Sequence, residues 1–154
     1  AFPVKNKELT IIPFATDELV VAMNPEHPLA GKDNLSIDEL KGVDFIAFEK
    51  DIPTRKATDE ILRNADIEVS IAMEFDNVET VKRALEINAG VAIIPKNTAS
   101  NEVQRNQLVV SRLDNGKHIR PLSLIHKKTR MLTPALRSFI EKMQHSPLAE
   151  KISA

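Results

Sequence analysis

Residues 76 to 95 read DNVETVKRALEINAGVAIIP, and this stretch predicts a helix that leads into a buried strand. Asn77 is a favourable N-cap, because its side chain can accept a hydrogen bond from the first helical turn. The apolar residues that recur at the spacing of one helix face are Val78, Val81, Ala84 and Leu85. Asn88 follows, where asparagine tolerates a left-handed backbone, and four apolar residues then lead to Pro95. Because a short, continuously apolar strand is usually covered on both faces, the stretch indicates a parallel or mixed sheet in an α/β domain.

Strand and helix patterns alternate along the rest of the chain. Strands are predicted at residues 8 to 14, 19 to 23, 44 to 48, 68 to 75, 108 to 113 and 121 to 127. Helices are predicted at residues 36 to 42, 49 to 64, 97 to 106 and after Thr133, which would cap a helix that begins at Pro134. This order is typical of an open, mixed α/β sheet.

Three details of these elements carry structural predictions. Pro13 favours an edge or crossover position for the first strand, because proline cannot donate to a neighbouring strand. In the strand at 68 to 75, Ile71 and Met73 alternate with polar or small residues, as Val69 does before them, which predicts one covered face. Asp51 is expected to cap the helix whose first turn holds Pro53.

Composition limits the class of protein. The 154 residues are 42% hydrophobic, enough to bury a core but short for two complete domains. Without cysteine, the chain cannot form disulfides, thiolate nucleophiles or cysteine-type zinc sites. No apolar run is long enough to span a bilayer, and the amino end lacks the apolar core of a signal peptide. We therefore expect a cytoplasmic protein of one domain, or one domain with a remnant of another, without a cofactor or metal.

The sequence shows no catalytic constellation. The four histidines have no metal-ligand spacing, and the four glycines form neither a nucleophile elbow nor a phosphate-cradling loop. Adjacent carboxylates such as Asp59 and Glu60 diverge on a helix, which favours a solvated face over paired acid and base groups. The last third of the chain has an excess of Lys and Arg, which we interpret as a surface bias. We predict that the protein is not an enzyme.

Several segments together resemble the effector-binding domain of LysR-type transcriptional regulators. These segments are DELVVAMNPEHPLAG at residues 17 to 31, SIDELKGVDFIAF at 36 to 48, PTRKATDEIL at 53 to 62, VETVKRALEINAGVAIIP at 78 to 95 and RPLSLIHKKTRMLTPALRSFI at 120 to 140. The family commonly has glycine where Asn88 stands here, and often a Gly-Ser-Gly turn where this chain has residues 50 to 53. The resemblance implies an α/β fold like that of the type 2 periplasmic binding proteins, with two lobes and an effector cleft between them.

The resemblance also implies which parts of such a regulator the chain contains. Residues 17 to 110 would form the complete lobe II, with a mixed sheet, and residues 1 to 16 and 111 to 154 would form part of lobe I. The first part of lobe I and the amino-terminal DNA-binding domain would be absent, so DNA would be contacted only through that absent domain. The apolar strand and helix in residues 120 to 145 would then lack partners. We therefore expect self-association through residues 1 to 16 and 120 to 145.

The candidate binding residues lie where strands give way to helices. Residues 49 to 55 follow a strand and open a helix, so backbone N–H groups and the helix dipole favour an anion or polar group there. Thr54 can donate and accept, and Arg55 can pair with a carboxylate or phosphate, although both could instead only cap and solvate the helix. The resemblance adds Asn77 at the next helix start and Thr16 at the crossover. The predicted effector-binding residues are Thr16, Glu49, Pro53, Thr54, Arg55 and Asn77.

The expected function is therefore effector sensing. The domain would bind a small polar or anionic metabolite between its lobes and change the arrangement of an oligomer on DNA, without any membrane partner. The alternative is a solute-binding receptor module of a transport system, against which the missing signal-peptide pattern counts. A third alternative, an enzyme of the same architecture, lacks catalytic residues.

Overall fold

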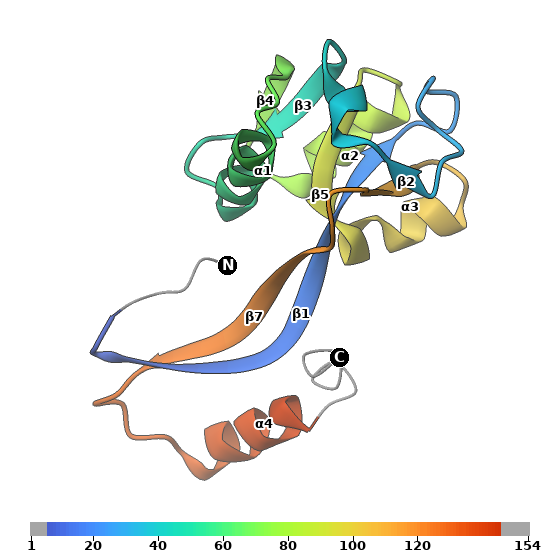
Figure 1. Ribbon diagram of the computed structural model, residues 1–154. Helices are drawn as coiled ribbons and strands as arrows, with labels where there is room; N and C mark the ends of the chain where they lie inside the picture. Colours follow the sequence, from blue (N-terminus) through green and yellow to red (C-terminus); the bar gives the residue numbers. More distant parts are fainter. Residues whose placement is uncertain (1–5, 146–154) are drawn as a thin grey trace. The chain divides into compact units, whose positions relative to one another are not determined.

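The computed structural model describes residues 6 to 145, and the chain divides into two compact units (Figure 1). Unit 1 comprises Ala1–Asp17 and Ile119–Ala154, and unit 2 comprises Glu18–His118. The assignment of lobes at residues 17 to 110, and at 1 to 16 with 111 to 154, stays a prediction. Residues 1 to 5 and 146 to 154 of those ranges lie outside the described part.

Unit 2 is built on a mixed sheet. The strands follow the order β2 (Asn34–Leu35), β6 (Val109–Leu113), β1 (Leu9–Met23), β5 (Val91–Pro95), β3 (Asp44–Phe48) and β4 (Ser70–Phe75). β1 is antiparallel to both β5 and β6, whereas β3 is parallel to both β4 and β5. The mixed α/β sheet expected from the sequence is confirmed.

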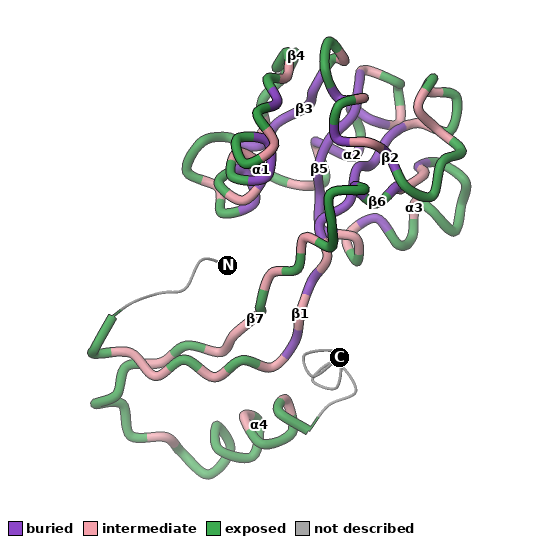
Figure 2. Tube along the Cα trace, in the orientation of Figure 1, coloured by how far each residue is buried: buried purple, intermediate pink, exposed green. Residues whose placement is uncertain are grey.

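Strand β5 lies inside the core, with every residue from Val91 to Pro95 buried (Figure 2). Val91 and Ile93 belong to a cluster that includes Ile61 and Leu62 of helix α1 (Pro53–Asn64). Ala92 and Ile94 belong to a second cluster, which contains the apolar side of helix α2 (Val78–Glu86). Both faces of β5 are therefore covered, as its continuous apolar run predicts.

Local signals fix several element ends. The side chain of Asn77 caps α2 by accepting a hydrogen bond from the Thr80 N–H at 2.9 Å, and Asn88 adopts a left-handed φ of 58°. Thr133 caps helix α4 (Pro134–Gln144) as predicted. Gly90 sits at φ 149°, where an added Cβ would collide with the backbone oxygen of Asp44. The short helices expected near residues 36 to 42 and 97 to 106 are η1 (Ile37–Leu40), and η2 (Lys96–Ala99) continued by α3 (Ser100–Gln104).

Two predictions about strands are wrong. The strands expected at 8 to 14 and 19 to 23 form one continuous strand, β1, which runs through Pro13 because the fixed φ of proline is compatible with extended backbone. The covered face predicted for β4 is absent: Ile71 and Met73 are 43% and 42% exposed. β4 is the last strand in the sheet order, beside β3, and α1 packs on β3 and β5. Edge position, which alternation alone cannot reveal, explains this exposure.

The predicted cap of α1 is also wrong. Its N-cap is Ile52, not Asp51, and the Ile52 side chain makes no capping hydrogen bond. Pro53 occupies the first helical turn and restricts the residue before it to extended backbone, and Ile52 has φ −69° and ψ 129°. The helix therefore begins one residue later than the aspartate would require.

Unit 1 contains the first part of β1, strand β7 (His118–Lys127), which pairs with β1, and α4. Among its described residues only Ala15 and Asp17 are buried, and α4 has no buried residue. A two-stranded ribbon with one helix cannot enclose its apolar residues on its own, so this unit has no core comparable to that of unit 2.

Candidate functional site

A strand-to-helix corner in unit 2 contains four of the predicted binding residues. β3 ends at Phe48 and α1 begins at Pro53. The turn between them is closed by a hydrogen bond from the Ile52 N–H to the Glu49 oxygen at 3.0 Å. The Glu49 N–H also donates to the Phe75 oxygen at 2.9 Å, which ties the corner to the end of β4. These two hydrogen bonds fix the backbone conformation of the corner.

The side chains of the corner differ in burial. Glu49 and Pro53 are exposed, whereas Thr54 and Arg55 are buried. At the start of any α-helix the first N–H groups have no partner within the helix, and they carry the positive end of its dipole. Because the N-cap residue of α1 makes no side-chain capping hydrogen bond, this end can receive a carboxylate, phosphate or carbonyl group.

Arg55 is held by other groups of the protein. Its Nε donates to Asp59 Oδ1 at 2.8 Å, and its Nη1 donates to the Phe48 oxygen at 2.7 Å and to Glu74 Oε1 at 2.5 Å. Burial disfavours the charged guanidinium, but the hydrogen bonds to Glu74 and Asp59 outweigh it, so the pKa of Arg55 is raised. The guanidinium is therefore engaged with three internal acceptors.

Asn77 lies at the same end of the sheet as the corner. β3 and β4 are parallel neighbours whose last residues, Phe48 and Phe75, are paired in register, and Asn77 follows Phe75 by two residues. Its side chain is exposed and, besides capping α2, donates to Asp76 Oδ1 at 2.7 Å. The starts of α1 and α2 thus emerge from adjacent strand ends.

Thr16, the remaining predicted residue, lies in β1 within unit 1 and is half-buried. The structure therefore brings Glu49, Pro53, Thr54, Arg55 and Asn77 to one end of the unit 2 sheet. The effector-binding role of all six residues stays a prediction.

Sequence reasoning missed the carboxylates that hold Arg55. Asp59 is four residues from Arg55 on one helix, a spacing that typically allows an ion pair and could have revealed this partner. Glu74 is nineteen residues away on an edge strand. No local pattern links these two residues, because their contact depends on the pairing of β3 with β4.

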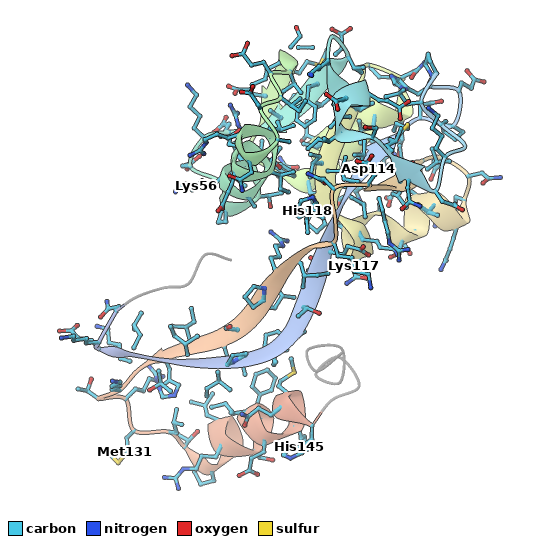
Figure 3. The ribbon with its side chains drawn as sticks, in the orientation of Figure 1. Lys56, Asp114, Lys117, His118, Met131 and His145 are labelled. Carbon is cyan, nitrogen blue, oxygen red and sulfur yellow. The ribbon has the colours of Figure 1, made fainter. Side chains whose placement is uncertain are left out.

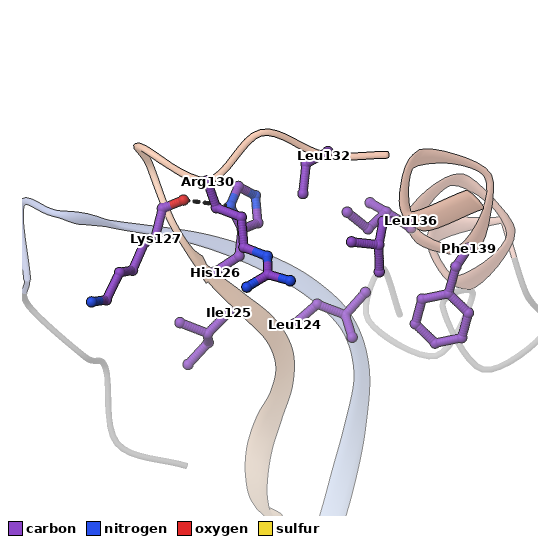
Figure 4. Close-up of a pocket in the computed structure, with 9 residues that line it drawn as sticks. Leu124, Ile125, His126, Lys127, Arg130, Leu132, Leu136 and Phe139 are labelled. Atoms are coloured by element: carbon purple, nitrogen blue, oxygen red, sulfur yellow. Dashed lines mark hydrogen bonds between the residues drawn. The ribbon is translucent and has the colours of Figure 1, made fainter. Parts of the chain in front are cut away.

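Unit 1 has a hollow of about 470 Å³ that the sequence did not predict. Leu124 of β7, Leu132, and Leu136, Phe139 and Ile140 of α4 supply most of its apolar lining (Figure 4). His126 and Arg130 also line it. The hollow is the space between the apolar side of α4 and the ribbon, and its chemistry suits apolar contacts.

Two other kinds of site are absent from residues 6 to 145. Among them, no group of three His, Asp or Glu residues could hold a metal ion. Within the same residues, no helix has both the length and the apolar character needed to cross a bilayer.

Comparison with known proteins defines the family. The model of the LysR substrate binding domain matches residues 1 to 146. The chain belongs to the LysR substrate-binding domain family. Among relatives of this LysR domain, a probable RuBisCO transcriptional regulator of Synechocystis sp. is 28% identical over 138 residues, which cover 88% of this chain and 40% of the relative. The transcriptional regulator CysL of Bacillus subtilis is 27% identical over 119 residues, which cover 77% and 40%. The chain spans about two fifths of the length of these regulators.

Solved structures that are similar to this chain include a regulatory domain and an effector-binding domain. The regulatory domain of Synechocystis CcmR, in complex with 2-PG, matches with a TM-score of 0.84 and 26% identity, over 92% of this chain and 68% of that one. The effector-binding domain of QuiR, in complex with shikimate, matches with a TM-score of 0.81 over 99% and 70%, and its 19% identity shows the fold alone. The LysR domain therefore has the type 2 periplasmic-binding-protein-like fold, as predicted. The relatives named here are transcriptional regulators rather than enzymes or transport receptors.

Proposed function

We propose that the chain is the effector-sensing part of a LysR-type transcriptional regulator and that the corner at residues 49 to 55, with Asn77, receives a small polar or anionic metabolite. The observation that carries the proposal is the pair of helix starts at adjacent strand ends, of which α1 has an N-cap residue, Ile52, that makes no side-chain capping hydrogen bond. Backbone N–H groups at such a start bind negatively charged or carbonyl oxygens.

The charges around the corner restrict the ligand. Glu49 and Asp51 are exposed beside the start of α1 and would repel a ligand with negative charge on every side. An effector that turns one anionic group toward α1 and presents hydroxyl or cationic groups to Glu49 fits both features. The complexes of CcmR with 2-PG and of QuiR with shikimate support a small-molecule ligand for this fold.

The regulatory part of the proposal extends beyond this chain. Effector binding between two lobes would shift the population of oligomer arrangements on DNA, in the cytoplasm. A domain outside this chain would contact the DNA, which the greater length of the regulators from Synechocystis and Bacillus subtilis supports.

The test is a thermal-shift screen of small carboxylates and phosphates against the regulator, repeated with Thr54→Val. A ligand of the corner raises the melting temperature by mass action. Thr54→Val keeps the shape of the buried side chain but removes its hydroxyl, so binding should weaken by about 1 to 2 kcal/mol while the unliganded protein stays folded. A ligand whose affinity is the same in wild type and Thr54→Val would place the effector elsewhere.

A further inference from the structure

We propose that Arg55 is a positioning residue that fixes the starts of α1 and α2 relative to each other by clamping the ends of β3 and β4. Its consequence for effector binding rests on the function proposed above, but the clamp itself does not. In this proposal Arg55 does not contact the effector, whereas the sequence led us to expect that it could pair with a carboxylate or phosphate.

The guanidinium connects three elements. Its acceptors are Asp59, one turn further along α1, the backbone oxygen of Phe48 at the end of β3, and Glu74 near the end of β4. The Arg55 side chain is only 7% exposed, so its guanidinium has little contact with water, whereas the Asp59 and Glu74 side chains are 44% and 40% exposed. A planar guanidinium reaches several acceptors at once, whereas the ammonium of lysine is a compact charge on a flexible stem and does not reproduce this geometry.

The clamp reaches α2 through a short stretch of chain. Glu74 is three residues before Asn77, whose side chain caps α2 through Thr80. The hydrogen bond from the Glu49 N–H to the Phe75 oxygen reinforces the same junction. Because β4 is the edge strand and its residues from Ser70 to Glu74 are exposed, Phe75 alone among its side chains packs against the second cluster, and the ion pair to Arg55 adds a further attachment at this end.

Arg55 also balances charge at the corner. Asp59 and Glu74 are partly exposed, and their carboxylates would remain close to the start of α1 if the guanidinium were removed. Two uncompensated negative charges would oppose an anion at that helix start. In this proposal Arg55 therefore both positions the two helix starts and offsets the negative charge of Asp59 and Glu74.

The experiment measures amide hydrogen exchange in the full chain for wild type, Arg55→Lys, Glu74→Gln and the double variant. The Thr80 amide, which Asn77 caps, should exchange at least about tenfold faster in Arg55→Lys, since hydrogen bonds to charged groups contribute enough for such a change. Exchange of Ile93 in β5 should stay unchanged, whereas a general loss of stability would accelerate both amides. The double variant should show less than the product of the single effects, because both changes break one contact.

Lys56→Met is the matched control, because Lys56 is the next residue of α1 and is exposed (Figure 3). It removes a positive charge at the adjacent position of α1 without touching the clamp, so exchange at Thr80 should remain at the wild-type rate. Unchanged exchange at Thr80 in both Arg55→Lys and Glu74→Gln, or equal acceleration at Thr80 and Ile93, would overturn the clamp.

A second measurement separates the clamp from the proposed function. Inorganic phosphate is titrated into wild type and Arg55→Lys, with the start of α1 observed by amide chemical shifts. Faster exchange at Thr80 together with weaker phosphate binding at the start of α1 supports both proposals. Faster exchange with no phosphate binding there in wild type supports the clamp and contradicts an anion site at the corner.

Discussion

Lys82 is a second buried cation in unit 2, and its side chain is 7% exposed. It donates to Glu102 Oε1 at 2.9 Å and to the Thr98 oxygen at 3.1 Å, and it pairs with Glu79 at 3.0 Å. Burial would lower the pKa of Lys82, but the hydrogen bonds to Glu102 and Glu79 outweigh it, and its pKa is raised. The hydrogen bond from Lys82 in turn lowers the pKa of Glu102. These contacts fasten η2 and α3 to α2.

Acid should therefore weaken unit 2 through Glu102. Because the pKa of Glu102 is lower in the folded than in the unfolded chain, the unfolded chain takes up the proton first. The stabilisation is complete above the ordinary glutamate pKa of about 4.3 and is lost as the pH falls through the folded value. Urea unfolding at a series of pH values should show a shallower acid loss in Glu102→Gln than in wild type. At neutral pH this variant should be about 1 to 3 kcal/mol less stable.

The exposed Glu60→Gln on α1 is the matched control and should keep the wild-type pH dependence. If Glu102→Gln lost stability toward low pH as steeply as wild type, the linkage to Lys82 would be contradicted.

At the scale of elements, the sequence predicts the structural features that depend on residues close together in the chain. The continuous apolar run of β5 and the caps at Asn77 and Thr133 depend on local spacing, and all three are confirmed. The exposure of β4 and the partnership of Arg55 with Glu74 depend on strand order, which is set by contacts between distant segments. The sequence therefore located the corner but not the clamp that holds it.

The end of α2 offers a test of a locally encoded feature. Asn88 is exposed at φ 58°, a region that costs an L-residue other than asparagine, aspartate or glycine about 1 to 2 kcal/mol. Asn88→Ala should lower the unfolding free energy by about 1 kcal/mol, whereas Asn88→Gly should change it little or raise it, as urea titration can measure. Asn64→Ala, at an exposed helical position in α1, is the control and should not destabilise. Equal losses for the alanine and glycine variants at 88 would contradict this account.

At the scale of the whole chain, the two units differ in how much of their apolar surface they bury internally. Unit 2 encloses two clusters of buried side chains. Unit 1 leaves Leu136 and Phe139 of α4 exposed beside a hollow, among its described residues. Exposed apolar faces of this kind tend to acquire a partner.

We therefore expect the isolated chain to form dimers or larger assemblies through residues 1 to 16 and 120 to 145, of which 1 to 5 lie outside the described part. Light scattering after size exclusion should report a mass above that of one chain. Phe139→Asp should shift the mass toward the monomer, because it places a charge in the hollow. Met131→Asp is the matched control, since Met131 is 89% exposed and does not line the hollow. A wild-type chain that remains monomeric at tens of micromolar would contradict the expectation.

The isolated chain should not bind duplex DNA in moderate salt, despite the excess of Lys and Arg in its last third. Binding driven by phosphate contacts weakens steeply as salt rises. Fluorescence anisotropy with a labelled duplex, in a salt series, measures this directly. Submicromolar affinity that disappears as salt increases would show that the basic residues form a nucleic-acid site.

Gly90 has a consequence for how this domain can evolve. Any side chain there must push against the Asp44 backbone, where β3 begins beside β5, and must also adopt a φ that L-residues avoid. No compensating change in a flexible neighbour can relieve that collision, because the obstacle is main chain. A laboratory selection for new effector specificity can therefore randomise the exposed residues 49 to 51 of the corner, but its surviving clones should all retain glycine at position 90.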